Sequence, residues 1–140
     1  MIRYVAVFVG LTLLLLSACG NDKKEVTPSG DPTQAARAFM NAFLNGDLTG
    51  CKSFASKAVQ NSILEQCQAY ADAQAITDLS GVSFILIEQD GLYALVEMQG
   101  TYTISAIDAG QRVMRQESTP IRIVMYYEDD FWRFDDFLSP

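Results

Sequence analysis

The hydrophobic pattern of this sequence changes its period once, near Gly81, and that change limits the class of fold. Before it, apolar side chains recur every three or four positions, which is the period of a helix with one buried face. After it, apolar and polar side chains alternate, which is typical of strands with one buried face. The sequence therefore predicts an α+β domain over residues 31–140, with N-terminal helices packed on an antiparallel sheet of four strands.

Three helices are expected in the first half of this domain. The first begins at Asp31, which can cap it, and Pro32 suits its first turn. Asn45-Gly46 ends this helix, and Asp47 can cap a short second one. The third helix is expected over residues 56–76, and its buried stripe consists of Val59, Ile63, Cys67 and Tyr70.

Four strands are expected in the second half, over residues 81–88, 92–107, 111–128 and 131–137. Asp90-Gly91 is a strong hairpin signal between the first two. Gly100 falls on the buried side of the second strand, where glycine marks a bulge, a bend or the close approach of another group. Pro120 cannot donate a hydrogen bond to a sheet, so we expect an interruption there, at an edge or a bulge.

The N-terminus has the features of a secretory signal. Arg3 is followed by an apolar run over residues 5–16, which is too short to span about 30 Å of hydrocarbon as a helix. Residues 16–19, Leu-Ser-Ala-Cys, resemble the lipobox of bacterial lipoproteins. That resemblance implies a signal peptide over residues 1–18 and a diacylglyceryl thioether on Cys19. The alternative is an ordinary signal peptide with a chance cysteine.

The stretch that follows the cysteine is charged and has one aliphatic side chain, so it cannot bury enough apolar surface to order itself. We expect residues 19–30 to be a lipidated tether. A single acyl chain binds a membrane weakly, and a second one makes the attachment stable. Gly20 stands where some Gram-negative bacteria read an inner-membrane retention signal from Asp, which favours the outer membrane in such an organism.

The chain is acidic, with 10 basic and 17 acidic side chains and a net charge of −7. This balance argues against a nucleic-acid partner, which rewards clustered Lys and Arg. It also argues against an electrostatic contact with anionic lipid. The expected membrane contact is therefore the lipid on Cys19, which places the domain in the bacterial cell envelope, facing the extracytoplasmic side.

The stretch DPTQAARAFMNAFLNGDLTGCKSFAS, residues 31–56, resembles the opening of nuclear-transport-factor-2-like (cystatin-like) cone domains. Gly46-Asp47 and Trp132 in the last strand fit the same pattern. In particular, the chain is similar to small bacterial lipoproteins of unknown function with this fold. The resemblance implies a curved sheet wrapped around helices, often with a pocket at the wide end.

Cys51 and Cys67 remain once Cys19 is lipidated, and outside the cytoplasm such a pair is a candidate disulfide. On one continuous helix they would lie roughly 24 Å apart, whereas a disulfide needs Cα atoms within roughly 7 Å. The bond therefore requires a fold-back near residues 53–56, which the separate second and third helices of cone domains permit. The alternative is two buried apolar thiols.

The chain has no histidine, which limits its chemistry. Ser-His-Asp and Cys-His catalysis within the chain are excluded, and no metal site or cofactor is expected. The acidic residues after position 127 lack the spacing of a calcium loop. Carboxylates and tyrosines could still move protons, as in the ketosteroid isomerases of the cone fold. No constellation matches theirs, so no catalytic residue is assigned.

A ligand pocket is the remaining candidate site. An apolar ligand fits an inner sheet face that carries aromatic and methionine side chains, with tyrosine hydroxyls to orient it. The alternative interpretation is that these side chains are core, and Tyr70 suits either role. The candidates are Tyr70, Met98, Tyr102, Met125, Tyr127 and Trp132.

Three functions follow from these observations. The first is a membrane-anchored, non-catalytic domain that binds a small apolar ligand or an envelope protein. The second is an interaction module with a filled core, which applies if no cavity of roughly 300 Å³ is present. The third is an isomerase-like or dehydratase-like enzyme, which needs a pocket carboxylate within hydrogen-bond reach of a tyrosine.

The lipobox makes a direct prediction. Cells that express the chain and are fed a fatty-acid analogue should label it, because the acyl groups attach through Cys19. In Cys19→Ser the label should be lost. Label that persists in this variant would contradict lipidation at this residue.

Overall fold

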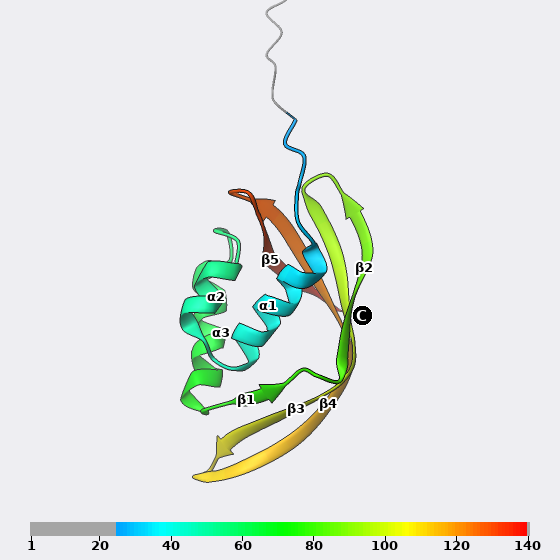
Figure 1. Ribbon diagram of the computed structural model, residues 1–140. Coiled ribbons are helices and arrows are strands. Elements are labelled where there is room, and N and C mark those ends of the chain that lie inside the picture. Colours follow the sequence, from blue (N-terminus) through cyan, green and yellow to red (C-terminus); the bar gives the residue numbers. More distant parts are fainter. Residues whose placement is uncertain (1–24, 140) are drawn as a thin grey trace, which may run out of the picture.

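The computed structural model describes residues 25–139, which form three helices and five strands (Figure 1). The predicted signal peptide and Cys19 lie outside the described residues. Residues 25–30, the described part of the predicted tether, contain no helix or strand. Within this described range, no helix has the length and apolar character needed to cross a membrane. The helices are α1 (Pro32–Leu44), α2 (Leu48–Phe54) and α3 (Gln60–Asp72), and the strands are β1 (Ile76–Asp78), β2 (Val82–Asp90), β3 (Tyr93–Asp108), β4 (Gln111–Glu128) and β5 (Phe131–Leu138).

The first two helices begin where the sequence predicts. The side chain of Asp31 accepts a hydrogen bond from the Thr33 backbone N–H at 2.8 Å. At the start of α2, Asp47 accepts one from the Gly50 backbone N–H at 3.0 Å. Each cap satisfies a backbone donor that has no partner within its helix, so both predicted caps are confirmed.

The third helix is shorter than predicted, and both of its ends have a physical reason. Before it, the Ser56 N–H donates to the carbonyl oxygen of Phe134 at 2.7 Å, which ties this segment to β5. After it, Gln74 adopts a φ of 47°, in the left-handed region. There the Ile107 N–H of β3 donates to the Ala73 carbonyl oxygen at 2.7 Å. Hydrogen bonds to the sheet thus replace helical ones at both ends.

The sheet is antiparallel, and β3 lies at its centre. Its order is β1-β3-β4-β5, while β2 pairs with another part of β3. The α+β class is confirmed, but the prediction of four strands was wrong, because β1 is too short to show alternation. This strand is fixed to α1: the Thr77 hydroxyl donates to the Leu44 carbonyl oxygen at 2.9 Å, and the Thr77 N–H donates to Asn45 Oδ1 at 2.8 Å.

The long strands β3 and β4 sweep past the helices in Figure 1. Gly100 has a φ of 113°, and a Cβ atom there would overlap the Gly81 carbonyl oxygen. Of the three alternatives that the sequence left open at Gly100, the structure shows the close approach of another group. β4 is unbroken, so the predicted interruption at Pro120 was wrong. β5 pairs with β4 only from Arg122 onward, so Pro120 does lie at an edge of the sheet. A residue without an N–H is tolerated there, because no strand among the described residues lies beside it on that side to accept a hydrogen bond.

The core lies between α1 and the inner face of the sheet. The ring of Phe39 stacks on Phe134 of β5, with centroids 4.0 Å apart and planes 7° from parallel. Phe39 also stacks on Phe43, at 5.5 Å. The largest of its fully buried side chains are Phe39, Phe134, Met40, Met98, Ile123, Met125 and Val96.

Cys51 of α2 and Cys67 of α3 form a disulfide, with Cα atoms 6.7 Å apart. Both residues are fully buried. The chain folds back between the two helices at residues 55–59, as the bond requires. The predicted disulfide is therefore present, and a loop of this size stabilises the fold by about 3 kcal/mol in the chain-entropy model.

Gly46 allows α1 and α3 to approach each other and supplies a stability test. It has a φ of 64°, and a Cβ atom there would overlap the backbone of Ala71. Gly91 has a φ of 54° with no atom within 4 Å of such a Cβ. Gly91→Ala should cost about 1–2 kcal/mol for the left-handed backbone. Gly46→Ala should cost that and about 1–3 kcal/mol more for the overlap.

Urea unfolding of the two variants gives the comparison. Equal losses in the free energy of unfolding would contradict the close approach of the α1 end to α3.

Candidate functional site

The six predicted pocket residues all lie between the helices and the inner face of the sheet, but they do not line one pocket. Met98 and Met125 are fully buried, and Tyr102 and Tyr127 are nearly so. Tyr70 lines one cavity and Trp132 lines another. The six candidates therefore do not share one cavity, because buried side chains occupy the middle of the inner face.

The filled middle consists of methionines and rings. Met98 pairs in register with Ile121, and Met125 pairs with Ala94 on one side and Phe134 on the other. Phe134 is the ring that Phe39 covers. Close packing of this kind leaves no room for a ligand, so core packing, the alternative interpretation, applies to these methionines.

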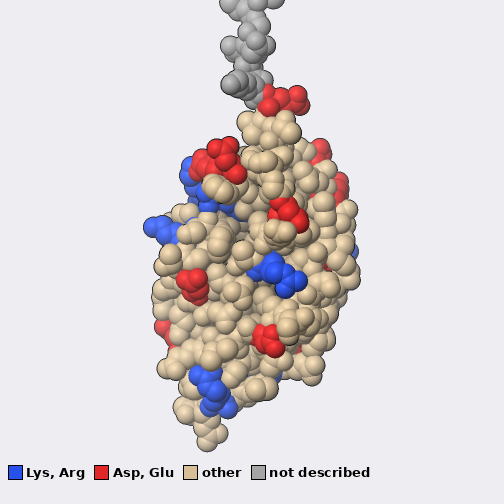
Figure 2. Space-filling model, viewed as in Figure 1, with Lys and Arg blue, Asp and Glu red and all other residues tan. Residues whose placement is uncertain are grey.

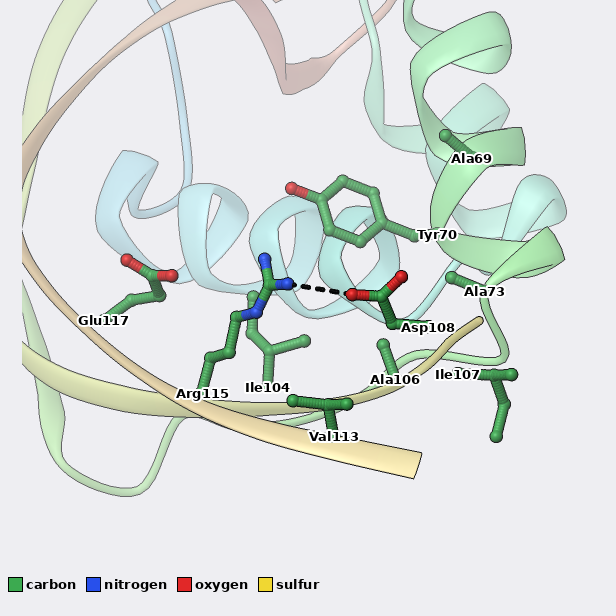
Figure 3. Close-up of a pocket in the computed structure, with 10 residues that line it drawn as sticks. All are labelled: Ala69, Tyr70, Ala73, Ile104, Ala106, Ile107, Asp108, Val113, Arg115 and Glu117. Atoms are coloured by element: carbon green, nitrogen blue, oxygen red, sulfur yellow. Dashed lines mark hydrogen bonds and ion pairs between the residues drawn. The ribbon is translucent and has the colours of Figure 1, made fainter. Parts of the chain in front are cut away.

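One cavity, which we call the distal cavity, lies between the end of α3 and the β3–β4 hairpin (Figure 3). Its volume is about 430 Å³, within the range of small-molecule sites. The chain enters the domain at the end that carries the β2–β3 and β4–β5 turns, and this hairpin is at the other end (Figure 1). The lining residues are Ala69, Tyr70, Ala73, Ile104, Ala106, Ile107, Asp108, Val113, Arg115 and Glu117.

The antiparallel register explains why these strand residues meet. Tyr102 pairs with Glu117, Ile104 with Arg115, and Ala106 with Val113. Paired residues share one face of a sheet, and every second residue returns to that face. The same inner face that is packed near Met98 therefore continues beyond α1 as an open surface.

A charged pair crosses the mouth of the distal cavity. Arg115 Nη2 lies 3.2 Å from Asp108 Oδ2, the contact dashed in Figure 3. Both side chains are about two-thirds exposed, 65% and 63%. An exposed pair of this kind is worth at most about 1 kcal/mol, so Arg115 can exchange this partner for a ligand.

Two tyrosines lie near Glu117, and one of them, Tyr70, lines this cavity. Burial raises the pKa of Tyr70, and the charge of Glu117 raises it further. The pKa of Tyr102 is raised by burial, by Glu117 and by Tyr70. Both phenols therefore remain protonated at neutral pH and can donate a hydrogen bond. In Figure 3 the Tyr70 ring extends from α3 toward the strands.

A second cavity, which we call the tether cavity, lies where the chain enters the domain. Its volume is about 770 Å³, and it is bounded by residues 29–31, α1, the end of α2 and the β4–β5 turn. The Ser29 hydroxyl and the Tyr127 hydroxyl lie 3.0 Å apart, which ties the incoming chain to β4. Trp132 packs edge-on against Tyr127, with centroids 5.3 Å apart.

Sequence reasoning found Tyr70 and Trp132 but missed Glu117 and Arg115. The alternation that marks Tyr127, Met125 and Ile123 as inward also reaches Arg115 when it is continued in steps of two. Because an interruption was expected at Pro120, the alternation was not extended from Ile121 to Glu117 and Arg115. An unbroken strand would have placed Glu117 opposite Tyr102 from the sequence alone.

The described residues show no other concentration of chemistry. No three His, Cys, Asp or Glu side chains among residues 25–139 are grouped so as to hold a metal ion. On the face shown in Figure 2, Lys and Arg side chains are scattered among acidic ones and form no broad basic surface. The two cavities are therefore the candidate sites.

No protein-family model matches the chain, and no curated protein sequence matches it. Two solved structures are similar in fold. One is the intermembrane space region of the chloroplast protein ARC6, with a TM-score of 0.54 and 12% identity, covering 79% of this chain and 97% of that one. The other is a putative calcium/calmodulin-dependent protein kinase II association domain from Xanthomonas campestris, with a TM-score of 0.52 and 14% identity, covering 81% and 90%. This likeness shows the fold alone, and it supports the fold that the resemblance implied.

Proposed function

We propose that this protein is a cell-envelope lipoprotein, anchored through Cys19, whose cone domain binds a small amphipathic molecule in the distal cavity. The observation that carries the proposal is the position of this cavity. The chain enters the domain at the opposite end (Figure 1). A tether to a membrane at that end leaves the distal cavity facing away from the bilayer, where it can sample the space beside the membrane.

The lining supports a ligand with an apolar body and a polar group. Ile104, Val113 and Ala73 provide apolar contacts, and the protonated hydroxyl of Tyr70 donates a hydrogen bond. Arg115 and Glu117 add one charge of each sign at the rim. Burial of the apolar part contributes about 25 cal/mol per Å², and the polar groups fix the orientation. A small ligand suits this cavity better than an envelope protein, which would need a broad surface.

Proton-transfer catalysis is a second candidate, favoured by one observation. Glu117 is the register partner of Tyr102 and lines the same cavity as Tyr70. A carboxylate base and a tyrosine donor are the parts of an isomerase or dehydratase site. Glu117 is exposed to solvent, however, whereas enzymes of this kind exclude water from the reacting groups. Binding is therefore the first proposal, and a turnover that Glu117→Gln abolishes would reverse the order.

Ala73→Leu tests the distal cavity, because the larger side chain fills it. Protein purified from its host should carry a small-molecule adduct in native mass spectrometry, and Ala73→Leu should lose it. Ala38→Leu makes the same change in the tether cavity and should keep the adduct.

Which of the two variants loses the adduct decides between the two cavities. An adduct that survives Ala73→Leu, or the absence of any adduct from the wild-type protein, would contradict ligand binding at this site.

A further inference from the structure

One long edge of the sheet has no neighbouring strand in the described part of the chain (Figure 1). On one side, β4 pairs with β3 along nearly its whole length, whereas on the other side it pairs with β5 only from Arg122 onward. The remaining edge of β4, residues 111–121, we call the free edge. Its side chains from Gln111 to Ser118 are all exposed. An edge of this length presents a row of backbone donors and acceptors to which another strand can add.

The other edges of the sheet, as far as the chain is described, are short, bulged or occupied. β1 has three residues. The pairing of β2 shifts register between Leu86 and Glu88, and a bulge of this kind hinders the addition of a further strand. β5 is also bulged, and its Phe134 carbonyl oxygen accepts from the Ser56 N–H. The free edge of β4 lacks such protection, because its register with β3 is regular throughout.

The β3–β4 hairpin fixes which backbone groups point to the free edge. Asp108 and Gln111 flank its tight turn and form a hydrogen-bonded pair. Such pairs recur at every second residue, so the odd-numbered residues of β4 bond to β3. The Ile107 N–H lies one position out of this phase and donates to Ala73 instead, as expected. The backbone N–H and C=O groups that point to the free edge are therefore those of Arg112, Met114, Gln116 and Ser118.

We propose that the free edges of two copies of this chain pair with each other, antiparallel, about a two-fold axis at Gln116. The length of the free edge selects this register. Gln116 is the midpoint of residues 111–121, so the hairpin of each copy ends where β5 of the other copy begins. The whole free edge of one copy is then covered by that of the other. This pairing does not depend on the function proposed for the distal cavity.

Charge selects the same register independently. Arg115 of each copy then lies opposite Glu117 of the other, on one face of the joined sheet. Moving the axis by one residue, to Arg115 or to Glu117, would instead place two like charges against each other. Glu117 has no ion-pair partner among residues 25–139. Arg115 is held only by the exposed contact with Asp108, at 3.2 Å, which it can exchange.

The joined sheet gains backbone hydrogen bonds and remains compatible with a membrane tether. Pairing of Met114, Gln116 and Ser118 across the axis forms about six such bonds. Pro120 cannot donate one, so it limits the ladder. The chain enters each domain at the end away from the hairpin, so the two tethers leave from opposite ends of the pair (Figure 1). Both reach one bilayer when the joined sheet lies along it, and confinement there raises the effective concentration for a small interface.

A cysteine on the axis tests the register. Gln116→Cys places two thiols at a hydrogen-bonded pair, whose Cα atoms lie about 5.5 Å apart, within the reach of a disulfide. In cells that express the full chain, an oxidant should convert most of this variant to a dimer on a non-reducing gel. Met114→Cys is the matched control, because it is equally exposed but lies more than about 13 Å from its counterpart, and it should stay monomeric. Equal cross-linking of the two variants, or none of Gln116→Cys, would overturn the proposal.

Charge reversal tests the pairing in a second way. Added to Gln116→Cys, either Arg115→Glu or Glu117→Arg alone sets like charges opposite each other and should lower the cross-linked fraction at least about tenfold. Both changes together restore the opposite charges and should restore cross-linking. Lys52→Glu, an exposed reversal on α2, should have no effect. A double reversal that stays monomeric, or single reversals that cross-link fully, would contradict the pairing. Circular dichroism of each variant verifies that it is folded.

Discussion

The stack of Phe39 on Phe134 is the contact on which the rest of the structure depends. It joins the first helix to the last strand, and Met98 of β3 and Met125 of β4 belong to the same core and are fully buried. Large apolar side chains at the middle of the sheet drive folding because they remove the most surface from water. The same side chains fill the space in which a central pocket would lie. The distal cavity and the tether cavity lie at the two ends of this packed middle.

The walls of each cavity are held in place by a few specific contacts between named residues. The disulfide between Cys51 and Cys67 joins α2 to α3, and Gly46 lets the end of α1 approach α3. These contacts hold Tyr70 over the strands. At the other end, the Asp31 cap and the Ser29–Tyr127 contact hold the incoming chain against the domain. A helix cap, a disulfide and a few hydrogen bonds thus position the two ends of the domain, whereas apolar packing fills the middle.

This difference explains how much the sequence could predict. Caps at Asp31 and Asp47 follow from neighbouring residues. The disulfide was a candidate beside two buried thiols, and the separate helices implied by the resemblance permitted it. The β1 strand escaped notice because three residues carry no period. The split into two cavities could not be predicted, because it depends on how completely Met98 and Met125 fill the space beneath Phe39. Alternation showed which side chains point inward, but it gave no measure of volume.

The central claim, a filled middle between two open ends, can be measured on the methionine methyl groups. A soluble nitroxide broadens the NMR signals of methyl groups that solvent can reach. Met114 is 73% exposed, whereas Met40, Met98 and Met125 are at most 1% exposed. The account predicts that nitroxide removes the Met114 signal and leaves those of Met98 and Met125 sharp. Broadening of Met98 and Met125 to the extent seen for Met114 would show a single open pocket and contradict it.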